Sequence, residues 1–249
     1  MITKLFKTKS SSSNSNKDVS KTILYKKFNI ALAQYIGERK NQEDYVAVEE
    51  IEEGVLAIVA DGLGGYDGGD VASSVVVNAF KTFFKENFEQ NGIKELLLDA
   101  THFSNQKLLE EKKEKPELEE MGTTLLAVYM TQNQLYWVSV GDTLLYHFNT
   151  SKKINIINEN HSVGHLLRSY ISGYVIDIIE LKSIEIQTQD NFLLASDGIE
   201  TLSNDVIEET FKEITSPQNI SETLIELVKK AKKRHQDNVS LVVLRQEES

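Results

Sequence analysis

The fold is decided by VLAIVADGLGG, residues 55–65, in which an unbroken apolar run ends in an aspartate followed by glycines. FLLASDG, residues 192–198, repeats this design. Continuous apolar runs of this length are typical of buried strands, and a glycine beside the aspartate lets the backbone approach a ligand closely. The two stretches therefore predict two buried strands that each deliver a carboxylate from one end, an arrangement suited to a cation site.

Composition limits the classes of partner. The 249 residues are 40% hydrophobic, enough for a sizeable core, and no linker interrupts the interior, so we expect one large domain. With 38 acidic and 27 basic residues, the net charge of −11 opposes binding to nucleic acid and to anionic membranes. The absence of cysteine excludes disulfides and thiolate chemistry and fits a reducing compartment.

The first residues differ in composition from the rest. Residues 1–22 contain several lysines and the run Ser10–Ser13, without the apolar stretch of ~7–15 residues that a secretory signal needs. We expect residues 1–22 to form a disordered tail and residues 23–249 to form a single domain. No segment approaches the ~18 apolar residues of a spanning helix, so the sequence predicts a cytoplasmic protein without a membrane partner.

Periodicity predicts the elements. Strands are expected over residues 28–35, 45–48, 55–60, 123–130, 134–140, 144–148, 154–157, 183–187, 191–195 and 239–244. Apolar residues at helical spacing predict helices over 71–88, 93–113, 203–214 and 221–233. Because strands cluster with strands and helices come in pairs, an α+β layered fold is favoured over an alternating parallel sheet.

Short motifs follow one another along the chain: RKNQED (39–44), DGLGG (61–65), GTT (122–124), GDT (141–143), SDG (196–198) and DN (237–238). In this order and spacing they resemble the metal-dependent serine/threonine protein phosphatases of the PP2C type, over residues 37–244. The resemblance implies a four-layer αββα sandwich of two antiparallel sheets flanked by helix pairs. It also implies a centre of two Mn²⁺ or Mg²⁺ ions at one end of the sandwich.

The resemblance assigns the ligands of these two ions. Asp61 resembles the carboxylate that bridges both ions, and Glu43 and the backbone carbonyl of Gly62 resemble ligands of one of them. Asp197 and Asp237 resemble ligands of the other ion.

Three further residues complete the implied site. Asp44 resembles the acid that supports the centre through its waters. Asp142 either ligates a third, weaker ion together with Asp197 or only forms a hairpin turn, and the sequence leaves both open. Arg39 falls where the family contacts substrate phosphate, so Arg39, Asp61 and Asp197 are the predicted catalytic residues.

The chemistry of phosphate monoesters agrees with these assignments. Two hard cations ~3.5–4 Å apart lower the pKa of a bridging water and neutralise charge on phosphoryl oxygens. Hard cations prefer oxygen ligands, and arginine offers a planar, permanently charged fork for phosphate. Without cysteine no phosphocysteine can form. We therefore expect hydrolysis of protein phosphoserine and phosphothreonine by direct in-line attack of a metal-activated water.

Some positions depart from the family pattern. Leu63 stands where many eukaryotic members carry a histidine, and Leu144 where arginine is frequent. Asn160 replaces the aspartate before His161, whose simplest interpretation is a hydrogen-bonded structural histidine. The segment from His161 to Ser183 is much shorter than the usual flap subdomain, as in a small prokaryotic-like branch.

Other interpretations remain at this point. Each Asp-Gly pair taken alone is an ordinary turn. A pseudophosphatase that binds a partner without turnover, or a phosphoesterase acting on small molecules, would share the same site. The expected partners are phosphorylated Ser/Thr proteins, either a Ser/Thr kinase or its targets, and the sequence gives no oligomeric state.

Overall fold

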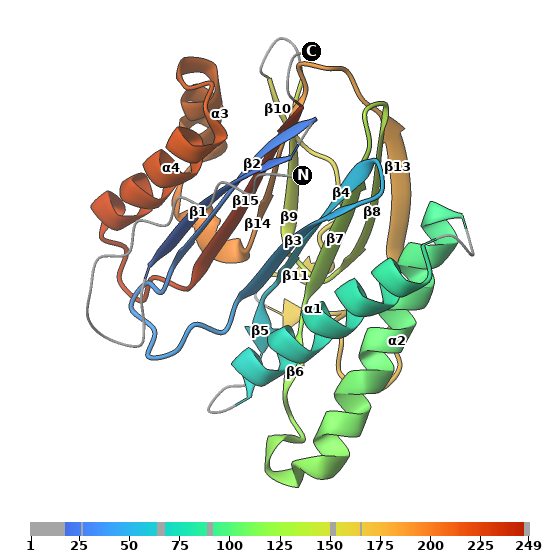
Figure 1. The fold of residues 1–249 in the computed structure, drawn as a ribbon. Helices are drawn as coiled ribbons and strands as arrows, with labels where there is room; N and C mark the ends of the chain where they lie inside the picture. The colour runs from blue at the N-terminus through green and yellow to red at the C-terminus, as the bar shows by residue number, and fades with distance from the viewer. Residues whose placement is uncertain are drawn as a thin grey trace.

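The computed structural model describes residues 18–25, 27–63, 68–88, 92–149, 153–164 and 166–246. Two antiparallel sheets pack face to face, and a pair of helices covers each outer face (Figure 1). The predicted α+β class and the four-layer αββα sandwich are therefore confirmed.

Both main sheets are antiparallel throughout. The first has the order β1 (Val19–Tyr25), β2 (Phe28–Tyr35), β15 (Val239–Gln246), β14 (Asn191–Ala195), β9 (Leu144–Phe148) and β10 (Ile154–Ile156). The second has the order β13 (Glu180–Glu185), β8 (Gln134–Val140), β7 (Leu125–Met130), β4 (Gly54–Ala60) and β3 (Tyr45–Ile51). Two short pairs accompany them, β5 (Gly62–Leu63) with β6 (Gly122–Thr123) and β11 (Ser162–Val163) with β12 (Leu166–Leu167).

The apolar run 55–60 is buried on both faces of its sheet, which explains why it is continuous instead of alternating. Residues 55, 57 and 59 of β4 face the core between the two sheets. Residues 56, 58 and 60 face the helices of the outer layer. Strands β14 and β15 divide their side chains between two cores in the same way.

Four helices complete the layers. Helices α1 (Gly69–Glu86) and α2 (Ile93–Glu114) cover the five-stranded sheet, and α3 (Asn204–Glu213) and α4 (Pro217–Ala231) cover the six-stranded sheet. Short 3₁₀ turns, η1 (Pro116–Leu118) and η2 (Asp197–Thr201), follow α2 and β14. Within the described residues, no helix is both long and apolar enough to cross a membrane.

Several boundaries differ from the sequence prediction. Helix α4 begins at Pro217 and not at Ser221, because proline suits a first helical turn and Ser216 caps that turn by accepting from the Asn219 N–H (3.4 Å). Strand β13 begins at Glu180 and not at Ser183. It is an edge strand, so it tolerates the polar residues that hid its first part from the sequence pattern.

The predicted boundary of the tail is also wrong. Residues 19–22 belong to β1, the edge strand that pairs with β2 from Val19 opposite Gln34 to Tyr25 opposite Phe28. Asp18 pairs with Lys229 of α4 (2.8 Å). Ser20, Lys21 and Thr22 are polar residues of this edge strand, and an edge strand tolerates polar side chains. Residues 1–17 of the predicted tail lie outside the described residues.

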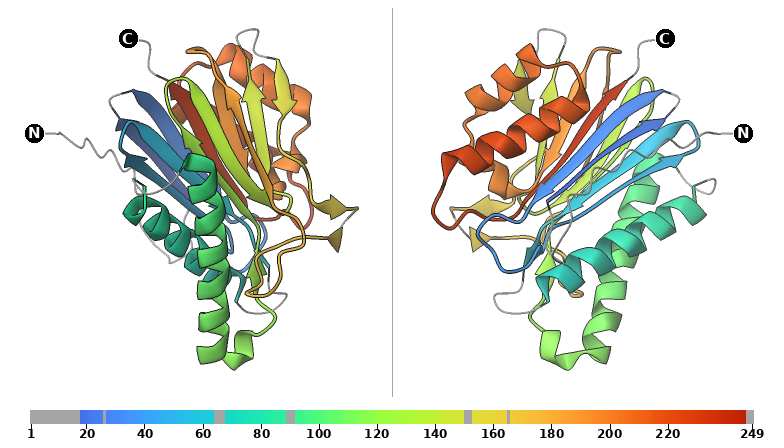
Figure 2. Two further views of the ribbon diagram at one scale, coloured as in Figure 1. Left: turned by 90° about the vertical axis from the view of Figure 1, so that its right-hand side faces the viewer. Right: turned by 60° about the vertical axis from the view of Figure 1, so that its left-hand side comes forward.

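The short segment expected in place of a flap is a small hairpin followed by an anchored loop. Hairpin β11–β12 projects from the body of the molecule (Figure 2, left). The chain then returns to Ile171, which pairs with Thr123 through two backbone hydrogen bonds of 2.8 and 3.0 Å. The remnant of the flap is thus tied to the segment that adjoins Asp61.

Candidate active site

Asp61 directly follows β4 and is held by its backbone. Its N–H donates to Thr124 Oγ1 (2.9 Å), and its carbonyl accepts from Thr123 Oγ1 (2.8 Å) and Thr124 N (2.9 Å). The GTT motif therefore holds the backbone of Asp61 in place. The register of β3 on β4 sets Tyr45 opposite Ala60, which brings Glu43 and Asp44 to the same end of the sheet as Asp61.

Asp197 and Asp237 come from neighbouring strands of the other sheet. Asp197 follows the end of β14 and Asp237 precedes β15, and Ala195 is paired with Leu241. Gly198 permits their close approach, because a Cβ at this position would lie 2.0 Å from the carbonyl oxygen of Asn238. Any side chain at residue 198 would push the two strand ends apart.

Asn238 anchors the loop that carries Arg39 and Glu43. Its Nδ2 donates to the carbonyls of Ile36 (2.8 Å) and Asn41 (3.1 Å), and its Oδ1 accepts from the N–H of Glu43 (2.8 Å). The side chain is buried, with 3% exposed. Sequence reasoning included Asn238 in a motif but did not predict this anchoring role.

Glu43 and Gly62 lie together at the start of α1. A Cβ on Gly62 would lie 2.2 Å from the carbonyl oxygen of Gly69 and 2.6 Å from that of Glu43. Ser73 Oγ donates to the Glu43 carbonyl (2.6 Å). Three backbone segments are therefore in direct contact, and only glycine fits between them.

The aspartates of the two sheets interact electrostatically. Burial raises the pKa of Asp61 well above its usual value, and the like charges of Asp44, Asp197, Asp237 and Asp142 raise it further. Burial, then Asp237 and Asp142, raise the pKa of Asp197 to about 6, although a hydrogen bond from Asp61 partly opposes the shift. Two carboxyl groups can share a hydrogen bond only when one of them holds a proton.

Asp44 is the most buried of these acids, with 3% of the residue exposed. Its Oδ2 accepts from Ser196 Oγ (2.7 Å), while burial raises its pKa to about 7. Oδ1 of Asp44 and Oδ1 of Asp197 are buried without a hydrogen-bond partner among the described residues. Buried carboxylate oxygens without partners are costly unless a cation or proton satisfies them.

Arg39 holds Asp237 in a half-exposed ion pair, with 2.5 Å between Nη2 and Oδ2. In this arrangement no three acidic or histidine side chains of the described residues are grouped ready to bind one metal ion. Asp142 occupies the turn between β8 and β9, and burial raises its pKa. Its like charge acts on Asp61 and Asp197, so it belongs to the same cluster.

Comparison with known proteins decides the family. Residues 34–239 match the family model of protein phosphatase 2C. The chain belongs to this family. Its relatives include the serine/threonine phosphatase stp of Listeria monocytogenes serotype 4b, which is 28% identical over 231 residues covering 82% of this chain and 89% of the relative. The serine/threonine protein phosphatase PstP of Mycobacterium tuberculosis is 28% identical over 209 residues, covering 76% of this chain and 40% of PstP.

Solved structures agree with the PP2C assignment. The crystal structure of the Mycobacterium tuberculosis phosphatase PstP superposes with a TM-score of 0.79 at 26% identity, over 89% of this chain and 100% of the solved chain. The catalytic domain of PstP in complex with two manganese ions gives the same TM-score and identity, over 89% of this chain and 99% of the solved one. The family and fold inferred from the motifs, and the class of protein phosphatase, are confirmed.

The residues of this PP2C member suit a hard divalent cation. The cluster offers carboxylate and carbonyl oxygens without sulfur, and two of its buried oxygens have no partner among the described residues. The backbone carbonyls of Glu43 and Gly69 lie in close contact with Gly62 in the same place. These oxygen ligands therefore fit the implied divalent cations, although Asp237 must first break its ion pair with Arg39.

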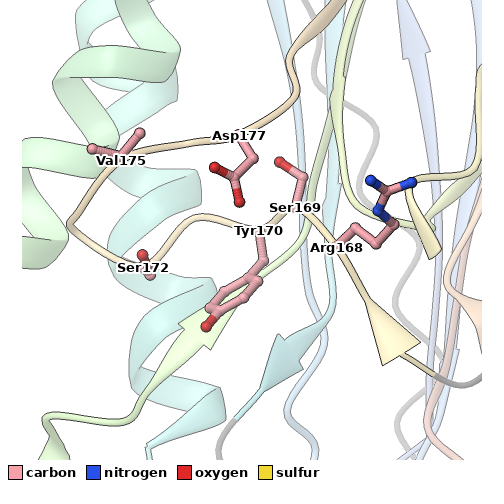
Figure 3. Close-up of a pocket in the computed structure, with 6 residues that line it drawn as sticks. All are labelled: Arg168, Ser169, Tyr170, Ser172, Val175 and Asp177. Atoms are coloured by element: carbon pink, nitrogen blue, oxygen red, sulfur yellow. The ribbon is translucent and has the colours of Figure 1, made fainter. Parts of the chain in front are cut away.

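A depression lies within the flap remnant of this phosphatase. It measures about 100 Å³ and lies in the loop that joins β12 to β13 (Figure 3). None of its lining residues is a predicted ligand: Arg168, Ser169, Tyr170, Ser172, Val175 and Asp177. Ser169 closes this loop, since its hydroxyl donates to the Ile178 carbonyl (2.8 Å) and accepts from the Ile178 N–H (2.9 Å).

Proposed function

We propose that this phosphatase hydrolyses phosphoserine and phosphothreonine in proteins with the help of two divalent cations held by its carboxylate cluster. The observation that carries the proposal is the gathering of Asp44, Asp61, Asp142, Asp197 and Asp237 in one place, where burial, and then the like charges of their neighbours, raise the pKa of Asp44, Asp61 and Asp197. So many acids in one buried place are stable only with protons or cations among them.

The donors are divided as the family pattern implies. Asp61 would serve both ions, Glu43 and the Gly62 carbonyl one of them, and Asp197 and Asp237 the other. Asp44 would act through water, and Asp142 would complete a third, weaker position. Mn²⁺ or Mg²⁺ bound in this way supplies an activated water and neutralises negative charge on the phosphoryl group. The manganese-bound PstP domain supports Mn²⁺ as the first choice.

Arg39 would bind the substrate phosphate. Its side chain is about half exposed and is held by Asp237, with Glu43 and Asp61 also within electrostatic reach. If Asp237 held a cation instead, the Arg39 guanidinium would be available for two phosphoryl oxygens. Leu63 cannot donate a proton, so the proton for the leaving oxygen would come from water or from another acid.

The biological setting is proposed on the same grounds. A phosphatase of this class would oppose a cytoplasmic Ser/Thr kinase, acting on the kinase itself or on its targets, and nucleic acid and membranes are not expected partners. Residues 18–246 would act as one catalytic unit, because the core between the two sheets draws on both of them.

Turnover of a phosphothreonine peptide by the purified protein tests the proposal, measured with Mn²⁺, with EDTA, and in Asp197→Asn. We expect hydrolysis that requires the metal and disappears in the variant. No turnover despite bound Mn²⁺ would favour a pseudophosphatase. Faster hydrolysis of free phosphothreonine than of the peptide would favour a small-molecule phosphoesterase.

A further inference from the structure

We propose that Asn158 and His161 are positioning residues that hold the Gly141–Asp142 turn in place relative to Asp61. Neither residue belongs to the donor set described above. The proposal rests on the proposed function only through the part that Asp142 plays in the metal centre.

His161 binds both polar groups of the Gly141 backbone. The Gly141 N–H donates to Nδ1 of His161 (3.1 Å), and the His161 N–H donates to the Gly141 carbonyl (3.0 Å). Gly141 has φ +114°, and a Cβ there would lie 2.7 Å from Cγ2 of Thr124. Gly141, which immediately precedes Asp142, is therefore held by its left-handed conformation and by the side chain of His161.

Asn158 holds the same turn from both of its strands. Its Oδ1 accepts from the Leu145 N–H (2.7 Å), and its Nδ2 donates to the Thr143 carbonyl (2.8 Å) and to Ser139 Oγ (3.1 Å). Asn158 and His161 are only 8% and 4% exposed. The buried side-chain amide of Asn158 makes three hydrogen bonds, and a buried polar network that is satisfied in this way rigidifies its surroundings.

Two hydroxyl groups connect this turn to Asp61. Thr143 Oγ1 lies 2.6 Å from Thr124 Oγ1, which itself accepts from the Asp61 N–H (2.9 Å). Because Thr124 Oγ1 accepts from Asp61, its own proton can be donated to Thr143. A continuous set of hydrogen bonds thus runs from Asn158 through Thr143 and Thr124 to the backbone of Asp61.

The imidazole is suited to accept at Nδ1. Burial lowers the pKa of His161, against the opposing effect of Glu180 and Glu159, which favours the neutral ring. Glu180 fixes the adjoining backbone by accepting from the Glu159 N–H (2.8 Å). The ring makes its hydrogen bond to Gly141 and not to a carboxylate, so it acts by positioning.

Paired substitutions of His161 test this role. His161→Leu removes the acceptor, whereas His161→Asn keeps an oxygen close to the place of Nδ1. With saturating Mn²⁺ and a phosphothreonine peptide, we expect a roughly 10–100-fold lower kcat for His161→Leu and near wild-type kcat for His161→Asn. His147→Leu is the matched control, because His147 is a poorly exposed histidine of β9 that pairs with Asp190. Equal losses in His161→Leu and His161→Asn would overturn the proposal.

A double-mutant cycle separates positioning from general destabilisation. If His161 acts through Asp142, His161→Leu costs less than about twofold in an Asp142→Ala background. Losses that multiply, or full activity of Asp142→Ala alone, would overturn the proposal. Wild-type turnover in the same assay shows that the proposed function itself stands.

Hydrogen exchange of the Gly141 amide gives a readout that needs neither metal nor substrate. We expect faster exchange in His161→Leu than in the wild type or His161→Asn, and an unchanged rate in His161→Leu would contradict the account. Should His161→Leu fail to fold, Thr143→Val removes the hydroxyl link instead and is expected to lower kcat. Thr101→Val, at a buried threonine in α2, is its control, and equal kcat in these two variants would overturn the proposal.

Discussion

Asp44, Asp61 and Asp197 are acids for which protons and cations compete. Burial is the largest cause of each raised pKa, and the neighbouring carboxylates add to it. In the metal-free protein the folded state therefore binds protons that the unfolded chain releases near pH 4. A divalent cation must displace these protons, so metal binding and pH are linked.

This linkage predicts how the stability of the metal-free protein depends on pH. Between the unfolded pKa near 3.9 and folded values of about 6 and about 7, the native state holds more protons than the unfolded state. The free energy of unfolding therefore falls as pH rises through this window. We expect Tm in EDTA to be roughly 5 °C higher at pH 5.5 than at pH 8, and less so in Asp44→Asn. A Tm that rises with pH would contradict this.

Arg39 has two roles, phosphate binding and the ion pair with Asp237, and two measurements on one variant can separate them. Arg39→Ala removes the phosphate contact and also frees Asp237 from its ion pair. We expect KM for a phosphothreonine peptide to rise about tenfold, whereas affinity for Mn²⁺ in calorimetry stays equal or increases. Lys40→Ala changes a neighbouring cation and is the control. An unchanged kcat/KM in Arg39→Ala would count against the phosphate contact.

At the scale of elements, the strands that carry the site were the easiest to predict. β4, β14 and β15 are buried on both faces, so their sequences are continuous apolar runs that end in aspartate or begin after it. β1 was assigned in part to a tail, because an edge strand is polar on its exposed side. The early start of α4 was missed although Ser216 and Pro217 signal it.

The edge strand β1 provides a stability test. Deletion of residues 1–17 should leave Tm and catalysis unchanged. Deletion of residues 1–25 exposes the edge of β2 and removes the contacts of Asp18 with Lys229 and of Ser20 with Glu222, so we expect Tm to fall by several degrees. Thermal unfolding of both deletions decides the matter, and equal Tm values would mean that β1 contributes nothing.

A single methyl group added at Gly198 would disturb the contact between the ends of β14 and β15. A methyl group on Gly198 would lie 2.0 Å from the Asn238 carbonyl oxygen, so Gly198→Ala must separate Asp197 from Asp237. We expect Mn²⁺ affinity to fall by at least about tenfold. Gly164→Ala is the control, since it strains a left-handed backbone (φ +61°) while nothing lies within 4 Å of a Cβ at that position. Wild-type affinity in Gly198→Ala would show that the spacing does not matter.

At the scale of the whole molecule, the site lies where the end of one sheet meets the end of the other sheet. The register that sets Tyr45 opposite Ala60 brings the first two motifs together, and the pairing of Ala195 with Leu241 does the same for the last two. Residues nearly two hundred positions apart are thus neighbours, as Arg39 and Asp237 show. This explains why a linear sequence displays the site as scattered motifs.

The sequence could predict that acids gather at one end of the sheets, because two buried strands each end in Asp-Gly. It could not predict the side chains that hold these acids. Asn238 and Ser196 act through contacts with residues distant in the chain, and their neighbours in sequence carry no pattern that reports those contacts. For His161 the sequence predicted a hydrogen-bonded structural role but not its partner Gly141. That information exists only in the packed structure.

Calorimetric titration of Mn²⁺ into the wild type, Asp61→Asn and Asp205→Asn tests whether the carboxylate cluster holds two cations, with Asp205 as an exposed acid of α3. The account predicts about two equivalents of Mn²⁺ for the wild type and for Asp205→Asn, and a loss of binding in Asp61→Asn, whose carboxylate would serve both ions. Absence of binding to the wild type, or equal binding to Asp61→Asn, would contradict it.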